Sequence, residues 1–356
     1  MKQDSLCSQF QGAILGAVLA YELGQCWLTY GSVLPGKDRM ELEDDPSLQP
    51  MISLLKTGVG HPQKPLSRVL SPPSSGNTGK LISQLTQSLI QYQGFDAVDY
   101  GRRVQTQIKP LFKSASEVAL LGLPLGLFFH DNLRALQQLD WKGLEGVAEI
   151  QDGIGLMATA IAEMLTPNPD LHRLIPNLLP QLQPETALTA KLEQVQTLLE
   201  HRASLETAVR QLTQTTKASS ANFDSENWIA LALSFYCFLT TPEDYSLTVL
   251  RSLQTGYHPE LTATLSGALS GGYQGLRGIP TRWRLAFSEK PLFSQTDPKI
   301  ENNSVEFNNY ETELLQLAHH LFAVWSGVYH PIPSHPACKT FTQSAVATPT
   351  RMRIQE

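Results

Sequence analysis

His258 and Glu260, separated by Pro259, are the two neighbouring side chains in this chain that are best suited to bind a metal ion. An imidazole and a carboxylate two residues apart suit Zn²⁺ or Mn²⁺ better than Mg²⁺. Catalytic zinc normally has three protein ligands, so this pair is one ligand short. The segment is therefore interpreted either as part of a metal site or as a solvated loop before a helix.

A second segment with possible chemistry reads Ser-Gly-Asn-Thr-Gly-Lys, residues 75–80. It lacks the spacing of a phosphate-binding loop, because Leu81 rather than Ser or Thr follows Lys80. Gly79 and Lys80 are expected at the start of a helix, where backbone N–H groups can hold an anion. Two interpretations remain open: a residual phosphate or nucleotide contact, and an ordinary helix cap made by Asn77 or Thr78.

Other reactive residue types form no recognisable site. The adjacent His319 and His320 point apart on a helix, so they are not expected to act as a ligand pair. Glu117 and Glu163 lie in apolar helical runs, where a carboxylate is either a catalytic remnant or a residue at the rim of the core. No Gly-x-Ser-x-Gly motif indicates a serine nucleophile.

Composition excludes several classes of function. The chain has 356 residues, of which 42% are hydrophobic and 17% are charged, with a formal net charge of -6. We expect no nucleic-acid partner, because such surfaces are strongly basic. The apolar stretch at residues 10–24 is too short to span a bilayer, and the four scattered cysteines fit a reducing compartment. A cytoplasmic protein with no membrane association is expected.

The apolar pattern is helical almost throughout and predicts an all-α fold in a single domain. We expect this domain over residues 10–330 and a disordered tail over residues 331–356, where Pro, Ser and Thr occur without periodicity. Residues 79–93 are expected to form a helix that carries Leu81, Leu85, Ser88, Leu89 and Tyr92 on one face. Residues 185–214 predict one long helix or two helices joined near His201.

Small residues and short motifs give the chain a family resemblance. The first helix is expected to carry Gly12, Gly16 and Ala20 on one face. The later segment contains, in order, Gly267-Ala268-Leu269-Ser270-Gly271, Tyr273, Gly275, Gly278-Ile279-Pro280 and Trp283. Together with Ser114-Ala115-Ser116 and the following Pro124-Leu125-Gly126-Leu127, these motifs resemble the ADP-ribosylglycohydrolase family from about Phe10 to Trp283.

The resemblance implies an orthogonal helical bundle with two Mg²⁺ ions at its centre. Such proteins cleave the N- or O-glycosidic bond between ADP-ribose and an acceptor. Mg²⁺ prefers carboxylate oxygens, and two ions can hold ribose hydroxyls and activate water. The family supplies its oxygens from a Thr-Asp-Asp loop before an early helix and an Asp-x-Asp-Thr loop before a late helix.

The metal-binding positions of the family are mostly replaced here. The late motif places its two acids on His258 and Glu260, and the early motif places Thr-Asp-Asp on Gly76, Asn77 and Thr78. The acid of the N-terminal Gly-Asp falls on Tyr21. Because neutral oxygens rarely hold Mg²⁺ without carboxylates, we expect the two-metal centre to be lost and no cofactor to be bound.

Three hypotheses follow from this departure. The leading one is a catalytically degenerate family member that binds ADP-ribose, a related nucleotide or a protein partner. The second is an active ADP-ribosyl hydrolase with a rearranged site, in which Glu260, Asp152 and Asn77 surround one ion. The third is a purely structural or regulatory interaction protein, with residues 185–214 as its docking surface.

Overall fold

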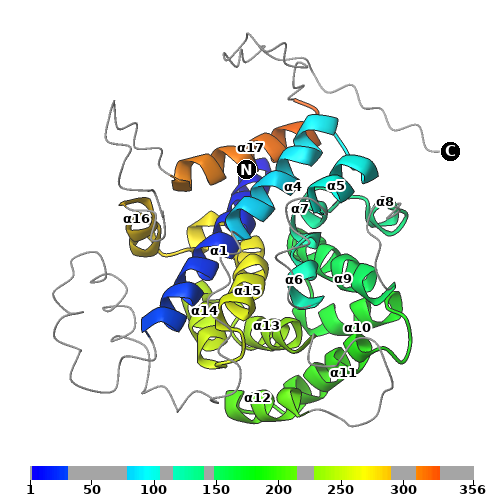
Figure 1. Ribbon diagram of the computed structural model, residues 1–356, viewed down its shortest axis with the longest axis vertical. Coiled ribbons are helices and arrows are strands. Elements are labelled where there is room, and N and C mark those ends of the chain that lie inside the picture. Colours follow the sequence, from blue (N-terminus) through cyan, green and yellow to red (C-terminus); the bar gives the residue numbers. More distant parts are fainter. Residues whose placement is uncertain are drawn as a thin grey trace.

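The computed structural model describes residues 2–30, 78–104, 115–139, 148–214, 228–289 and 310–328. These residues form helices and connecting turns, and within these ranges there is no strand (Figure 1). The predicted all-α fold class is confirmed. The predicted tail at 331–356 lies outside the described residues, and the predicted domain bounds stay a prediction.

The centre of the molecule is a pair of antiparallel helices, α1 (Lys2–Tyr30) and α15 (Pro259–Gln274). Their backbones approach closely at small residues, as the pattern in the sequence predicts. A Cβ atom added to Gly12 would lie 2.3 Å from the backbone oxygen of Gly271. At the other end of the pair, a Cβ atom on Gly24 would lie 2.3 Å from Cα of Glu260. This contact places the C-terminal part of α1 directly against the start of α15.

The remaining helices surround this pair (Figure 1). The first half of the chain adds α4 (Thr78–Tyr92), α5 (Ala97–Arg103), α6 (Ala115–Ala119), α7 (Gly122–Phe128), α8 (Leu133–Gln137), α9 (Ala148–Met164), η2 (Leu171–Arg173), α10 (Leu174–Leu178) and η3 (Leu179–Gln181). The second half adds α11 (Ala187–Glu200), α12 (Leu205–Thr213), α13 (Ile229–Thr240), α14 (Tyr245–Gln254), η5 (Leu276–Gly278), α16 (Thr281–Glu289) and α17 (Tyr310–Trp325).

The structure tests two of the helices that the sequence predicts. Residues 185–214 form two helices rather than one, and Arg202 in the connection has a φ of 47°. Ser204 then caps α12 by accepting a hydrogen bond from the backbone N–H of Thr207 at 3.2 Å. In α4 the predicted face is buried at Leu81, Leu85, Ser88 and Leu89. Tyr92, the last residue of the helix, is 45% exposed.

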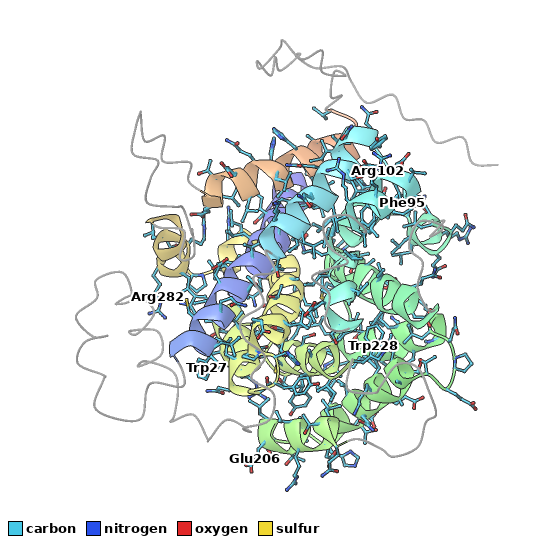
Figure 2. All side chains as sticks on the ribbon, viewed as in Figure 1. Trp27, Phe95, Arg102, Glu206, Trp228 and Arg282 are labelled. Carbon is cyan, nitrogen blue, oxygen red and sulfur yellow. The ribbon has the colours of Figure 1, made fainter. Side chains whose placement is uncertain are left out.

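The core continues between α9 and α13. Trp228, at the start of α13, is fully buried, and a Cβ atom on Gly153 of α9 would lie 2.3 Å from its indole ring. Figure 2 shows Trp228 inside the bundle, whereas Glu206 of α12 extends from its edge. Cys237 of α13 is fully buried. Among the described helices, none is long and apolar enough to cross a membrane.

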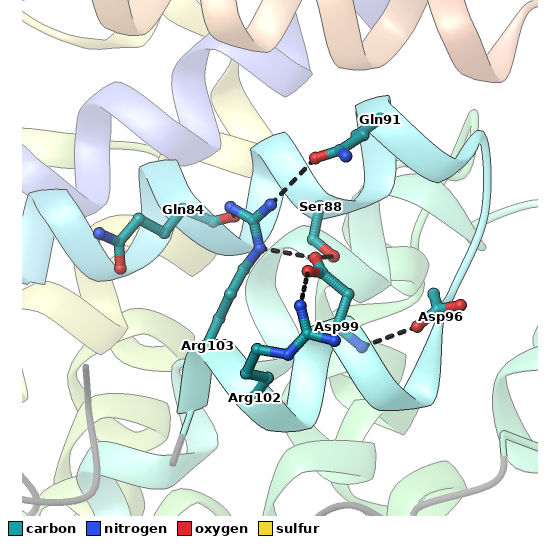
Figure 3. Close-up of polar contacts among 7 residues, drawn as sticks. All are labelled: Gln84, Ser88, Gln91, Asp96, Asp99, Arg102 and Arg103. Atoms are coloured by element: carbon teal, nitrogen blue, oxygen red, sulfur yellow. Dashed lines mark hydrogen bonds and ion pairs between the residues drawn. The ribbon is translucent and has the colours of Figure 1, made fainter. Parts of the chain in front are cut away.

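A polar network joins α4 to α5 on one side of the bundle (Figure 3). Asp99 accepts hydrogen bonds from Ser88 Oγ at 2.7 Å and from Arg103 Nε at 2.6 Å, both at its Oδ2 atom. Arg103 also donates to the backbone oxygen of Gln84 and to Oε1 of Gln91. The network therefore connects one face of α4 to α5 through both Asp99 and Arg103.

Candidate functional site

The side chain of Tyr21, in the second half of α1, is the point at which the candidate site residues come together. Its hydroxyl group is hydrogen-bonded to the side chain of Thr78, the first residue of α4. Burial raises the pKa of the Tyr21 hydroxyl well above its ordinary value, and the negative charges of Glu22, Glu260 and Glu117 raise it further. These groups come from α1, α15 and α6, so four elements contribute to one site.

Glu22 is the most strongly perturbed acid of this site. Burial raises the pKa of its carboxyl group to about 7. Its Oε2 atom is inaccessible to solvent and has no hydrogen-bond partner among the described residues. Glu22 also contributes to the raised pKa of Cys26, about 12, for which burial is the larger cause. Glu22 is therefore mostly a neutral carboxylic acid below pH 7.

Glu260 and His258 lie at the start of α15, opposite α1. Glu260 is 16% exposed, and its Oε2 atom also has no hydrogen-bond partner among the described residues. The Nδ1 atom of His258 lies 3.8 Å from Oε1 of Glu260. His258 has a φ of 39° and precedes Pro259, so the left-handed backbone turns the chain into the helix. The two residues are neighbours in space, as their spacing in the sequence indicates.

These residues do not fit a two-magnesium centre. Within the described ranges, no three His, Cys, Asp or Glu side chains are grouped closely enough to hold a metal ion. Burial raises the pKa of the Tyr21 hydroxyl well above its ordinary value, so Tyr21 is not a replacement for a carboxylate ligand. The described residues therefore do not provide the group of carboxylates that a two-magnesium centre needs.

The other predicted site residues lie apart from this group or outside the described residues. Asp152 is on α9, where its Oδ2 atom accepts a hydrogen bond from the backbone N–H of Gln183 at 3.1 Å. Asn77 precedes the described part of α4, so its predicted role in a metal site stays a prediction. His319 and His320 lie on α17 with ring centroids 6.4 Å apart, and His319 is exposed. They have the separated arrangement expected for adjacent helical residues.

The sequence-based interpretation missed Glu22. The resemblance places the N-terminal acid of the family on Tyr21. No role was predicted for Glu22, which is the next residue. A carboxylate inside an otherwise apolar helix was the available signal, since buried acids often mark functional sites. Glu117 is also a carboxylate in an apolar helical run. The sequence allowed two interpretations of it, a catalytic remnant or a residue at the rim of the core. The structure places Glu117 close enough to Tyr21 for its charge to raise the tyrosine pKa.

The sequence model of the ADP-ribosylglycohydrolase family matches residues 114–330, which is more than half of the chain. The chain belongs to the ADP-ribosylglycohydrolase family. The match includes Glu117 and Glu260, whereas Tyr21, Glu22 and Thr78 lie N-terminal to it.

Solved structures support the same fold for the family member described here. One of them, an ADP-ribosylglycohydrolase-related protein complex, has a TM-score of 0.51 and 17% sequence identity. The similarity covers 90% of this chain and 99% of that chain. A search of curated proteins found no match. The family resemblance drawn from the short motifs is confirmed.

Proposed function

We propose that this protein is a non-catalytic member of the ADP-ribosylglycohydrolase family that binds an ADP-ribosyl group or a related nucleotide without a metal ion. The observation that supports this function most directly is the position of Tyr21. Its phenol is neutral and hydrogen-bonded to Thr78, and the negative charges of Glu22, Glu260 and Glu117 act on it. The family resemblance would require charged oxygen ligands in this part of the fold.

Charge is the reason to expect binding without hydrolysis. Two Mg²⁺ ions carry four positive charges, which several carboxylates must offset. In this site one of the three acids, Glu22, is held largely neutral by burial, and a protonated tyrosine lies beside it. Without bound metal, no Lewis acid is available to activate water for attack on a glycosidic bond.

The same groups suit the recognition of hydroxyl-rich ligands. A protonated carboxyl group, a phenol and a threonine hydroxyl each donate one hydrogen bond and accept others. The Oε2 atoms of Glu22 and Glu260 are buried and lack partners within the described residues. Ribose hydroxyl groups would donate hydrogen bonds to such oxygens, which would remove the unfavourable free energy of leaving them unsatisfied.

Isothermal titration calorimetry with ADP-ribose, with and without Mg²⁺ or Mn²⁺, tests this function. Saturable binding that is unchanged by either metal, together with no release of ADP-ribose from an ADP-ribosylated peptide, is the expected result. Binding that requires metal would contradict the proposal. If no binding occurs under either condition, a role as an interaction protein would be favoured, with residues 185–214 as the first surface to mutate.

Glu260 gives specific support to a second candidate function, which is hydrolysis at a rearranged one-metal site. Its buried Oε2 atom lacks a hydrogen-bond partner within the described part of the chain and could receive a cation. In this alternative Asn77 would join Glu260 around one ion, and Asp152 would have to leave its contact with the backbone N–H of Gln183 to complete the site. Metal-dependent release of ADP-ribose, abolished by Glu260→Gln, would support the alternative. Release that persists in Glu260→Gln would remove Glu260 from any such mechanism.

A further inference from the structure

Helix α17 docks on the bundle through a cluster of aromatic side chains. It packs against α1, α4 and α7 (Figure 1). Phe10 of α1 is fully buried, and its ring centroid lies 5.5 Å from that of Phe322 and 6.2 Å from that of Trp325 on α17. Aromatic pairs at such distances stabilise a contact beyond the area that they bury. The cluster therefore contributes directly to the docking of α17 on the core.

His130, just beyond the end of α7, is the member of this cluster that can gain a charge near neutral pH. Its ring centroid lies 4.5 Å from that of Trp325 and 5.6 Å from that of Phe10. Its Nδ1 atom lies 2.8 Å from the backbone oxygen of Leu127, and a carbonyl oxygen only accepts, so Nδ1 carries a proton. In the neutral ring Nε2 is then unprotonated. A second proton there would place a positive charge among the aromatic rings.

The elements packed around His130 present few charges to it. Helix α1 contributes Phe10 and α17 contributes Trp325, neither of which becomes charged in acid. Asp131 is the charged side chain that acts on the imidazole among the described residues, and its Oδ1 atom accepts a hydrogen bond from Trp325 Nε1 at 3.2 Å. Cys7, one turn before Phe10 on α1, carries a thiol, which is ordinarily neutral below pH 7. A positive charge on His130 would thus be offset mainly by one carboxylate that the Trp325 indole shares.

We propose that His130 makes the docking of α17 sensitive to pH, because protonation of its ring weakens the contact between α17 and α1. A charged imidazole packed between Phe10 and Trp325 gives up much of its hydration, and burying a charge is unfavourable unless partners offset it. The Leu127 oxygen and Asp131 favour the charged form, but burial is the larger effect and lowers the pKa of His130. The inference does not depend on whether the protein binds ADP-ribose.

Acidification should therefore loosen α17. Since the folded protein binds a proton at His130 less readily than the unfolded chain, the contribution of the neutral ring is complete above the ordinary histidine pKa of about 6.5. It decreases as the pH falls below that value. Helix α17 also packs against α4, whose first residue is Thr78, so its docking supports a helix of the candidate site.

Hydrogen exchange of the full chain, followed in peptides of α17 at about pH 7.5 and about pH 5.5, tests this inference on both sides of the ordinary histidine pKa. Protection factors, which correct for the intrinsic effect of pH on exchange, are compared between wild type and His130→Gln. Gln keeps an N–H for the Leu127 oxygen and does not titrate. His319→Gln is the matched control, because His319 is an exposed histidine on α17 itself. Glu22 and His320 are present in all three proteins, so their titration cancels in the comparison.

We expect acidification to lower the α17 protection factors of wild type by at least about threefold relative to His130→Gln, because only the wild type gains the buried charge. His319→Gln should behave as wild type. If His130→Gln does not fold, His130→Phe keeps a ring against Trp325 and serves as the second variant. An equal pH dependence in wild type and in the folded His130 variant would overturn the inference. Wild-type protection that rises on acidification relative to that variant would also overturn it, since the Trp325 ring would then stabilise the charged imidazole.

Discussion

Glu22 illustrates at the residue scale how burial changes the chemistry of a carboxyl group. Its pKa is raised from 4.5 to about 7 by burial. Between these values the folded protein keeps the proton on Glu22, whereas the unfolded chain releases it. The folded state therefore binds more protons, and the free energy of unfolding must fall as the pH rises through this window.

Replacing Glu22 by Gln should remove this pH dependence. From pH 5 to pH 8, the wild type should lose roughly 2–3 kcal/mol of stability relative to Glu22→Gln, because each pKa unit corresponds to about 1.4 kcal/mol. Urea denaturation at several pH values measures the difference. Glu193→Gln, an exposed change on α11, is the matched control and should follow the wild-type curve. Parallel curves for wild type and Glu22→Gln would show that Glu22 does not titrate in this range.

At the scale of elements, the contact between α1 and α15 depends on the absence of side chains. A Cβ atom on Gly271 would lie 2.1 Å from the backbone oxygen of Gly12, and neither backbone can move without disturbing the rest of the pair. The same helices carry Tyr21, Glu22 and Glu260. Close packing at the glycines thus brings the two halves of the candidate site together.

Gly271→Ala should destabilise the protein by about 3 kcal/mol through overpacking of the α1–α15 contact. Gly155→Ala provides the comparison, because Gly155 is also helical and its added Cβ atom would meet nothing within 4 Å. That change should be neutral or stabilise the protein by about 0.5–1 kcal/mol through helix propensity. Thermal and urea unfolding distinguish the two, and similar stabilities for both variants would argue against the close contact.

The α4–α5 network gives a second prediction at this scale. Burial raises the pKa of Asp99, but hydrogen bonds from Ser88 and Arg103 outweigh this effect and leave the pKa below its ordinary value. Asp99 therefore stabilises the fold above its unfolded pKa, and this contribution is lost as the pH falls. Asp99→Asn should lower the free energy of unfolding by about 1–3 kcal/mol at neutral pH, measured by urea denaturation.

Arg102 and Arg103 provide an internal control for that network. Arg102 is 63% exposed and lies 3.8 Å from Asp99, whereas Arg103 is 21% exposed and lies 2.6 Å from it. Arg102→Gln should change stability by less than about 0.5 kcal/mol, since exposed ion pairs contribute little. An equal effect of Arg102→Gln and Arg103→Gln would mean that the buried geometry of Figure 3 is not the source of the stability.

At the scale of the whole molecule, segments that are far apart in the sequence contact each other in the core. The hydroxyl group of Tyr245 donates a hydrogen bond to the backbone oxygen of Gly16 at 2.7 Å, although 229 residues separate them. Helix α17 lies against α1 and α4 and buries Leu314, Ala318 and Leu321 (Figure 1). The fold therefore depends on residues up to α17.

Truncation after residue 330 tests where the folded domain ends. Because residues 331–356 are expected to be disordered, their removal should leave the melting temperature within about 1 °C of the full chain. A second truncation before α17 should abolish cooperative unfolding, since it exposes the apolar surface that Leu314 and Leu321 cover. A large loss of stability in the first truncation would contradict the predicted tail.

Helical periodicity and small-residue spacing were sufficient to predict the all-α fold, the buried face of the first helix and the family. These are local properties: each residue's face on a helix follows from its position in the chain. The pairing of His258 with Glu260 was accessible for the same reason. The break between α11 and α12 was predicted only as one of two alternatives, because the helical pattern alone does not show where a helix ends.

The family resemblance already assigned Tyr21, Thr78 and Glu260 to one site, and tertiary structure alone added Glu22 and Glu117 to it. These residues come from four helices, and their distances depend on how α1 packs against α15, which no local pattern specifies. The charge state of Glu22 depends on the same packing, because other elements must exclude water before its pKa can rise. The amino-acid sequence thus determined which helices form and which faces they bury, and the packing determined the chemistry of the residues between them.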